Sequence, residues 1–246
     1  MLQNLQNINE LYGHKLGALD GEIGSVKDFY FDDKTWTIRY LVADTEPWLP
    51  ECLVLLSPHA FGQWDKHQKT LRVKLTKKQI ENSPLLESHI PVSRQYEIAY
   101  HRYYGWPTYW NAGGLRNAAG YSEVPSPSKD DVEAHLPLHL RKDSHLQSTQ
   151  EVTGYHIQTV GRAIGQVSGF LVDDHSWAIR DLIVEAGHWY KGKGKATLIS
   201  PNKIRRISYA ESKVFVNLTV RDIQQTTETN LARAGSEDHA METLRD

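Results

Sequence analysis

Apolar and polar residues alternate along several short stretches in the first third of the chain. The stretches 23–32 (IGSVKDFYFD) and 35–44 (TWTIRYLVAD) are rich in β-branched and aromatic residues, and the turn-forming pair Asp32-Asp33 ends the first. The stretch 52–58 (CLVLLSP) is apolar up to Pro58, and 71–76 (LRVKLT) alternates again. We therefore expect four short strands here.

The same pattern returns in the last third of the chain. Strands are expected at 165–174 (GQVSGFLVDD), 176–185 (SWAIRDLIVE), 196–201 (ATLISP) and 214–219 (VFVNLT). Each set is followed by a short predicted helix, at 76–84 and 219–226, with Thr76 and Thr219 as N-caps and Pro84 ending the first.

These two sets are an internal repeat. At an offset of 141 residues, identical residues pair at Gly13/Gly154, Ile23-Gly24/Ile164-Gly165, Val26/Val167, Asp32-Asp33/Asp173-Asp174, Trp36/Trp177 and Ile38-Arg39/Ile179-Arg180. At an offset of 143 they pair at Ser57-Pro58/Ser200-Pro201, Leu75-Thr76/Leu218-Thr219 and Ile80/Ile223. Identity in the same order indicates duplication.

The predicted organisation is a first domain at 8–88, a linker at 89–150, a second domain at 151–225 and a polar tail at 226–246. The linker begins with an aromatic segment, and its second half is polar and rich in Pro and His, which predicts mobility. The fold prediction is all-β: two small antiparallel β-barrels in tandem with a few short helices, because barrel closure removes exposed sheet edges.

Each copy resembles a PRC-barrel domain, as found in the photosynthetic reaction-centre H subunit and in a bacterial ribosome-maturation factor. The matching residues are LYGHKLGALDGEIGSVKDFYFDD from Leu11, WTIRYLV from Trp36, LVLLSP from Leu53 and LRVKLTKKQIENSP from Leu71. The segment PVSRQYEIAYHRYYGWPTYW from Pro91 is similar to the continuation seen in bacterial tandem PRC-barrel proteins. The resemblance implies a binding or assembly module with no shared catalytic residues.

The segment 102–110 (RYYGWPTYW) is the candidate partner-binding site, through Tyr103, Tyr104, Trp106, Tyr109 and Trp110. Spacings of four, three and one between Tyr96, Tyr100, Tyr103 and Tyr104 predict one face of a short helix that Gly105 and Pro107 end. Five exposed aromatic side chains would exceed the apolar patch that a monomer tolerates. We therefore favour packing onto a barrel, or a contact between two chains, over stacking of a ligand.

A second candidate is the lysine loop 187–195. It spells G-x-x-x-x-G-K, but Gly194 stands where a phosphate-binding loop needs a hydroxyl, and a strand follows instead of a helix. Contact with an anion or RNA through Lys191, Lys193 and Lys195 is the weaker alternative.

No other stretch suggests chemistry. His135, His139 and His145 are interpreted as solvated linker residues, Asp32-Asp33 and Asp173-Asp174 as turn residues, and Arg39 and Arg180 as their surface ion-pair partners. No metal, cofactor or catalytic set is predicted.

Composition restricts the class of protein and the cellular compartment that we expect. A net charge of −2 and one cysteine, Cys52, argue against a generally nucleic-acid-binding or disulfide-dependent protein. No signal peptide or membrane-spanning run is recognisable, so we expect a cytoplasmic protein, free or held at the inner membrane face by a partner. The resemblance implies that the protein is bacterial.

The function expected from these observations is non-catalytic protein binding or assembly, with a homodimer as one form of it. The alternatives are an RNA- or ribosome-associated factor, or an accessory protein of a photosynthetic complex. An enzyme is disfavoured because no acid, base or nucleophile set is identifiable.

Overall fold

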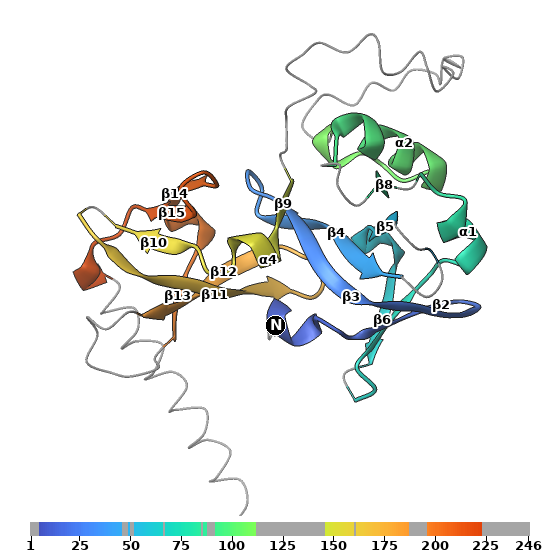
Figure 1. Ribbon diagram of the computed structural model, residues 1–246, viewed down its shortest axis with the longest axis horizontal. Helices are drawn as coiled ribbons and strands as arrows, with labels where there is room; N and C mark the ends of the chain where they lie inside the picture. Colours follow the sequence, from blue (N-terminus) through green and yellow to red (C-terminus); the bar gives the residue numbers. More distant parts are fainter. Residues whose placement is uncertain are drawn as a thin grey trace, which may run out of the picture. The chain divides into compact units, whose positions relative to one another are not determined.

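The computed structural model describes residues 5–45, 49, 52–65, 67–84, 86–87, 92–111, 146–159, 161–186 and 196–222 (Figure 1). Two compact units are present, and each is described by itself. Unit 1 comprises Met1–Gly13, Asp28–Leu41 and Gln147–Asp246, and unit 2 comprises His14–Lys27 and Val42–Leu146. The boundaries differ from those of the sequence copies, because residues 28–41 of the first copy are grouped with the second.

The described part of the chain is mostly β, as the sequence predicts. One sheet has seven strands, in the order β13-β12-β11-β10-β15-β14, with β1 added beside β11. Its strands are β1 (Leu5–Asn7), β10 (His156–Gln158), β11 (Ala163–Asp173), β12 (Ile179–Ala186), β13 (Ala196–Ile199), β14 (Ile204–Ser208) and β15 (Lys213–Val216).

The other sheet has eight strands, in the order β6-β7-β2-β3-β4-β5-β8, with β9 added beside β3. Its strands are β2 (Lys15–Ala18), β3 (Gly21–Asp32), β4 (Thr37–Asp44), β5 (Cys52–Leu56), β6 (Phe61–Asp65), β7 (Thr70–Val73), β8 (Leu86–Glu87) and β9 (Leu146–Ser148). The long strands β3 and β4 contribute residues to both units.

Short helices connect the strands (Figure 1). They are the α-helices α1 (Lys77–Glu81), α2 (Arg94–Tyr104) and α4 (Thr149–Val152) and the 3₁₀ helices η1 (Ile8–Leu11), η2 (Pro58–Ala60), η3 (Tyr109–Asn111) and η4 (Pro201–Lys203). The predicted cap of α1 is confirmed: the Thr76 hydroxyl accepts from the Gln79 amide, and the Gln79 side chain accepts from the Thr76 amide.

The two sheets share one strand order. The run β5-β4-β3-β2-β7-β6 in one corresponds to β13-β12-β11-β10-β15-β14 in the other, element for element along the sequence repeat. In both sheets, the first of these six strands along the chain pairs in parallel with the last: β2 with β7, and β10 with β15. Equivalent residues also adopt the same unusual backbone: Trp36 and Trp177 have φ of 52° and 57°.

The prediction of purely antiparallel sheets is therefore wrong. The parallel pairs β2/β7 and β10/β15 make both sheets mixed. A parallel pair needs a long crossover, and here the rest of each repeat supplies it. Among the described strands, the strand order of each sheet is open and does not close into a ring.

Apolar residues of the predicted strands form the core. Along β3, Ile23, Val26, Phe29 and Phe31 are buried, and along β11 Ile164, Val167, Phe170 and Val172 take the same role. The spacings of three, three and two between these residues depart from strict alternation, and along β11 the spacing from Val167 to Phe170 coincides with the register shift at Val167/Gly169.

Several sequence predictions fall outside the described residues. They are the lysine loop with Lys191, Lys193 and Lys195, the linker histidines His135, His139 and His145, and the polar tail. The backbone of Cys52 lies in β5, and its side chain is outside the description. No described helix is both long enough and apolar enough to cross a membrane.

Candidate functional site

Helix α2 carries the predicted aromatic segment. Ser93 caps its start by accepting a hydrogen bond from the Tyr96 amide, and Gly105 ends it in the left-handed region with φ of 69°. The amide of Trp106 then donates to the carbonyl of His101 at 2.9 Å, which turns the chain back along the helix. The helix predicted from the tyrosine spacing, with its break at Gly105, is confirmed.

Tyr100 anchors the inner face of α2. Its ring is fully buried, its hydroxyl donates to the Leu55 carbonyl at 2.9 Å, and that hydroxyl accepts from the Ser57 amide at 3.1 Å. Burial raises the pKa of this phenol, so it stays protonated. Tyr100 therefore fixes the helix to the end of β5.

The turn after α2 brings three aromatic rings together. Trp106 stacks on Tyr104, with ring centroids 4.4 Å apart and planes 13° apart, and it also stacks with His59, whose ring centroid is 5.6 Å away. The hydroxyl of Tyr103 donates to the carbonyl of Gln79 at 3.0 Å, which ties the helix to α1. Stacked and edge contacts of this kind are the favourable geometries for aromatic side chains.

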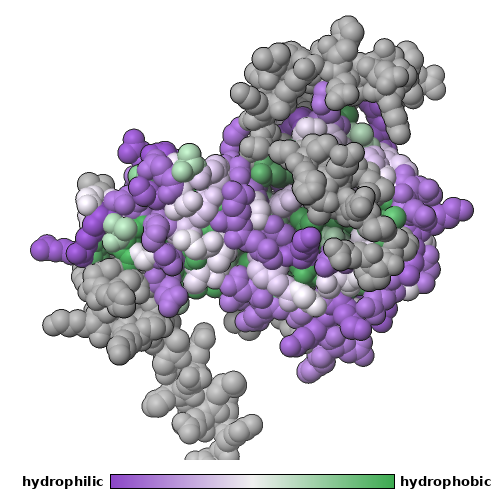
Figure 2. Space-filling model, viewed as in Figure 1, coloured by the Kyte–Doolittle hydropathy of each residue, from purple (hydrophilic) through white to green (hydrophobic). Residues whose placement is uncertain are grey.

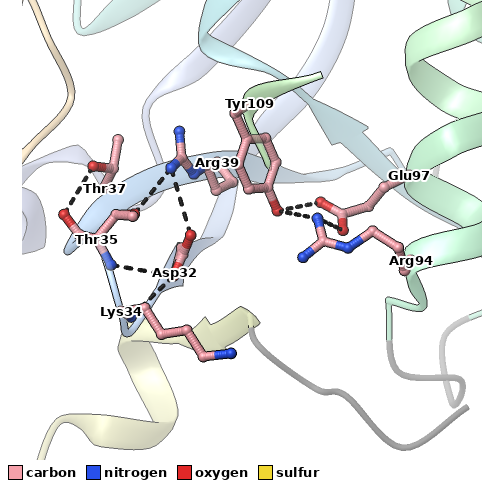
Figure 3. Close-up of polar contacts among 8 residues, drawn as sticks. All are labelled: Asp32, Lys34, Thr35, Thr37, Arg39, Arg94, Glu97 and Tyr109. Atoms are coloured by element: carbon pink, nitrogen blue, oxygen red, sulfur yellow. Dashed lines mark hydrogen bonds and ion pairs between the residues drawn. The ribbon is translucent and has the colours of Figure 1, made fainter. Parts of the chain in front are cut away.

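A buried ion pair holds η3 against α2 (Figure 3). Glu97 is fully buried, with one carboxylate oxygen 3.0 Å from an Arg94 nitrogen, and the other accepts from the Tyr109 hydroxyl at 2.6 Å. Arg94 also donates to the Tyr109 oxygen at 3.2 Å and lies over the Trp110 ring, 4.2 Å from its centroid. Burial, and then the Glu97 charge, raise the pKa of Tyr109 above its ordinary range.

His101 is the second buried polar side chain in this region. Its Nδ1 lies 3.0 Å from the Pro107 carbonyl, and since a carbonyl only accepts, Nδ1 carries the proton. Its ring meets those of Tyr109 and Trp110 at their edges, with centroids 6.1 and 5.5 Å away. Burial lowers the pKa of His101, which favours the neutral ring.

All five predicted residues thus lie in one aromatic cluster, which we define as the rings of Tyr100, Tyr103, Tyr104, Trp106, Tyr109 and Trp110 together with His59 and His101. Tyr104, Trp106, Tyr109 and Trp110 are half-buried, and Tyr103 is 42 % exposed. The hydroxyls of Tyr100, Tyr103 and Tyr109 bond to protein groups. What this region offers to a partner is therefore ring surface rather than reactive groups.

Sequence reasoning missed two members of this region. His59 comes from η2, far away in the sequence, and nothing local indicated it. Glu97 could have been found, because its spacing of three from Arg94 is the spacing at which charged helix residues interact.

The duplicated aspartates occupy the predicted turns. An oxygen of Asp32 accepts from the Lys34 and Thr35 amides at 2.9 and 3.2 Å (Figure 3). Asp173 accepts from the His175 and Ser176 amides in the same way. The predicted ion pairs are confirmed, Arg39 to Asp32 at 3.5 Å and Arg180 to Asp173 at 3.0 Å. The first is no surface pair, because only 8 % of the Asp32 side chain is exposed.

Within the described ranges, no three His, Cys, Asp or Glu side chains are placed to hold a metal ion. A search with models of known protein families finds no match to this chain, and a search of curated proteins finds none either.

Proposed function

We propose that the chain is a non-catalytic assembly protein built from two PRC-barrel-like modules, and that it binds a protein partner through the outer face of α2. The modules are supported by the repeated strand order and by the residues that resemble the family. Register shifts occur along β11 at Val167/Gly169 and Leu171/Val172. Such bulges bend a long strand, as the wall of a small barrel requires.

The observation that carries the binding role is the composition of the exposed side of α2. Ile98 and Tyr103 are 39 % and 42 % exposed, and Arg102 is exposed between them. Hydrophilic side chains cover much of the described surface on the face shown in Figure 2. Among the described residues, the large hydrophobic side chains that are exposed are Leu5, Leu19, Ile98 and Tyr103. Tyrosine and arginine are the residue types most enriched where protein interfaces gain their affinity.

The opposite side of α2 makes this surface rigid. Tyr100 fixes the helix to the end of β5, and the Arg94–Glu97–Tyr109 contacts fix η3 to the helix. A surface whose side chains are already positioned loses less entropy when a partner binds. Surface stacking of a planar ligand is less well supported, because Trp106 already stacks on Tyr104 and His59.

The test is a pull-down from the source cells, followed by binding of the captured partner in purified form. We expect the double variant Ile98→Ser/Tyr103→Ala to weaken that binding by roughly tenfold or more, because truncation of an interface tyrosine has an effect of this order. The matched control is Leu19→Ser, an apolar residue 70 % exposed on the turn after β2, which should bind normally.

Two results would count against the proposal. One is a partner that binds the double variant as well as it binds the wild type. The other is capture that ribonuclease abolishes, which would favour the RNA-associated alternative. That alternative has one supporting observation in the described part of the chain: Lys203, Arg205 and Arg206 are exposed in and beside β14, the last strand in the order of its sheet.

A further inference from the structure

Contacts within unit 1 recur with the two sequence copies exchanged. The Ile38 amide donates to the Trp177 carbonyl at 2.8 Å, and the Ile179 amide donates to the Trp36 carbonyl at 2.7 Å. Between them, Thr37 pairs with Ala178 in an antiparallel bridge. Residues 36, 37 and 38 are equivalent to 177, 178 and 179 at the offset of 141. When each residue is replaced by its equivalent in the other copy, the first hydrogen bond becomes the second, and the bridge becomes itself.

The segments that precede each copy are exchanged as well. Strand β1 pairs with β11 of the second copy, and β9 pairs with β3 of the first. These segments are themselves equivalent, because Leu5-Gln6 is repeated as Leu146-Gln147 at the same offset, and a short helix follows each. In a two-fold interface both partners use the same surface, so every contact occurs twice with the roles of the two partners exchanged. The contacts between the two copies have this property.

We propose that this interface is self-complementary, so that the partner it fits is a second copy of the same repeat, and that the present chain is such a pair joined covalently. The proposal uses no residue of the α2 face and does not depend on the proposed function. It also explains why the sequence copies and the compact units have different boundaries: each copy supplies segments that complete the other.

One position breaks the symmetry. Asp28 on β3 is 9 % exposed, and its carboxylate accepts from the Ser148 hydroxyl, from the Thr149 hydroxyl at 3.0 Å and from the Gln150 amide at 3.2 Å. The equivalent residue on β11 is Gly169. There a Cβ would lie 2.9 Å from the side-chain nitrogen of Asn9, which donates to the Ser168 carbonyl.

The difference between Asp28 and Gly169 determines which copies can pair with each other. If two first copies paired, Asn7 and Ile8 would stand where Ser148 and Thr149 stand, and the buried carboxylate of Asp28 would lose both hydroxyl donors. Asp28 would keep the Phe29 amide as a donor, but a buried carboxylate that loses part of its hydrogen bonds is destabilised, whereas pairing of a first with a second copy provides both hydroxyls. Asp28 therefore directs each first copy to a second copy.

The experiment starts from the full chain with a specific protease site inserted between Ser128 and Lys129. After cleavage, native mass spectrometry separates the three pairings: first with second, first with first, and second with second. We expect the wild-type halves to remain together as first-with-second pairs, with first-with-first pairs absent. In Asp28→Gly, first-with-first pairs should increase by roughly tenfold or more, because the substituted position would then accommodate Asn9 as Gly169 does.

Asp28→Ala is the matched control. It removes the same charge but keeps the Cβ that would meet Asn9, so it should give fewer first-with-first pairs than Asp28→Gly. Immediate separation of the wild-type halves would overturn the proposal, as would equal pairing in wild type and Asp28→Gly. If Asp28→Gly does not fold, Thr149→Val removes the hydroxyl partner instead and should weaken the first-with-second pair.

Discussion

At the scale of single residues, the buried carboxylate of Glu97 determines which substitutions the α2 region tolerates. Glu97 is fully buried, yet Arg94 and Tyr109 surround its carboxylate with donors. Such a group is tolerated only while its partners stay in place, because an isolated buried charge is far less stable than a solvated one. The contacts that hold η3 to the helix are therefore also the ones most sensitive to substitution.

Tyr109→Phe tests this directly. The variant keeps the ring and removes the donor to Glu97, so we expect the free energy of unfolding to fall by ~1–3 kcal/mol. Urea denaturation measures it. The matched control is Tyr103→Phe, whose exposed ring loses a bond to a backbone carbonyl only and should change stability by less than ~1 kcal/mol. Equal effects of the two substitutions would show that Glu97 does not depend on Tyr109.

The turn aspartates predict a pH dependence. Burial by itself would raise the pKa of Asp32, but hydrogen bonds from Lys34 and Thr35 and the Arg39 charge outweigh it and hold the pKa below the ordinary 3.8. A carboxyl with a lowered pKa in the folded state contributes stability above pH 3.8, and that contribution is lost as the pH falls through the folded pKa.

Asp32→Asn should therefore give a shallower loss of stability than the wild type shows as the pH falls below 3.8. At neutral pH we expect a loss of about 1 kcal/mol or less, because asparagine can still accept the turn amides. Urea denaturation across this pH range is the measurement. Asp173→Asn, at the equivalent position of the second copy, should flatten the acid slope in the same way, because hydrogen bonds from the Ser176 amide and from Arg180 hold the Asp173 pKa below 3.8. An acid slope that Asp32→Asn leaves unchanged would contradict the assignment.

At the scale of elements, close backbone approaches determine where the sheets tolerate a side chain. Gly24 on β3 has φ of +128°, and a Cβ there would lie 1.8 Å from the carbonyl oxygen of Asp44 on β4. The backbones of β3 and β4 are so close at this point that no residue with a Cβ atom fits between them. The repeat places Gly165 at the equivalent position, but Gly165 does not have a positive φ, so this constraint applies to Gly24.

Gly24→Ala should therefore lower the free energy of unfolding by roughly 3 kcal/mol or more, or prevent folding. Thermal unfolding followed by circular dichroism measures it. Gly13→Ala is the control: Gly13 also has a positive φ, of +74°, but its Cβ would meet nothing within 4 Å, so only the backbone cost of ~1 kcal/mol applies. A variant at Gly24 as stable as the one at Gly13 would contradict the close approach.

At the scale of the whole molecule, duplication explains features that neither copy explains alone. The two sheets have the same strand order, and the exchanged strands β1 and β9 each complete the other copy. A fused pair can diverge at single positions, as Asp28 and Gly169 have, without losing the interface.

The amino-acid sequence predicts the strands β3, β4, β5, β7, β11, β12, β13 and β15, the Asp-Asp turns with their arginine partners, the capped helix α1 and the helix α2. It does not predict the strands β1, β2, β6, β8, β9, β10 and β14. The predicted features depend on residues close in the chain, so alternation, turn preference and helical spacing report them. The parallel pairs, the burial of Glu97 between Arg94 and Tyr109, and the exchange of β1 and β9 became visible only in the folded chain. Each brings together residues whose meeting depends on how the chain folds back on itself, and no local pattern records that.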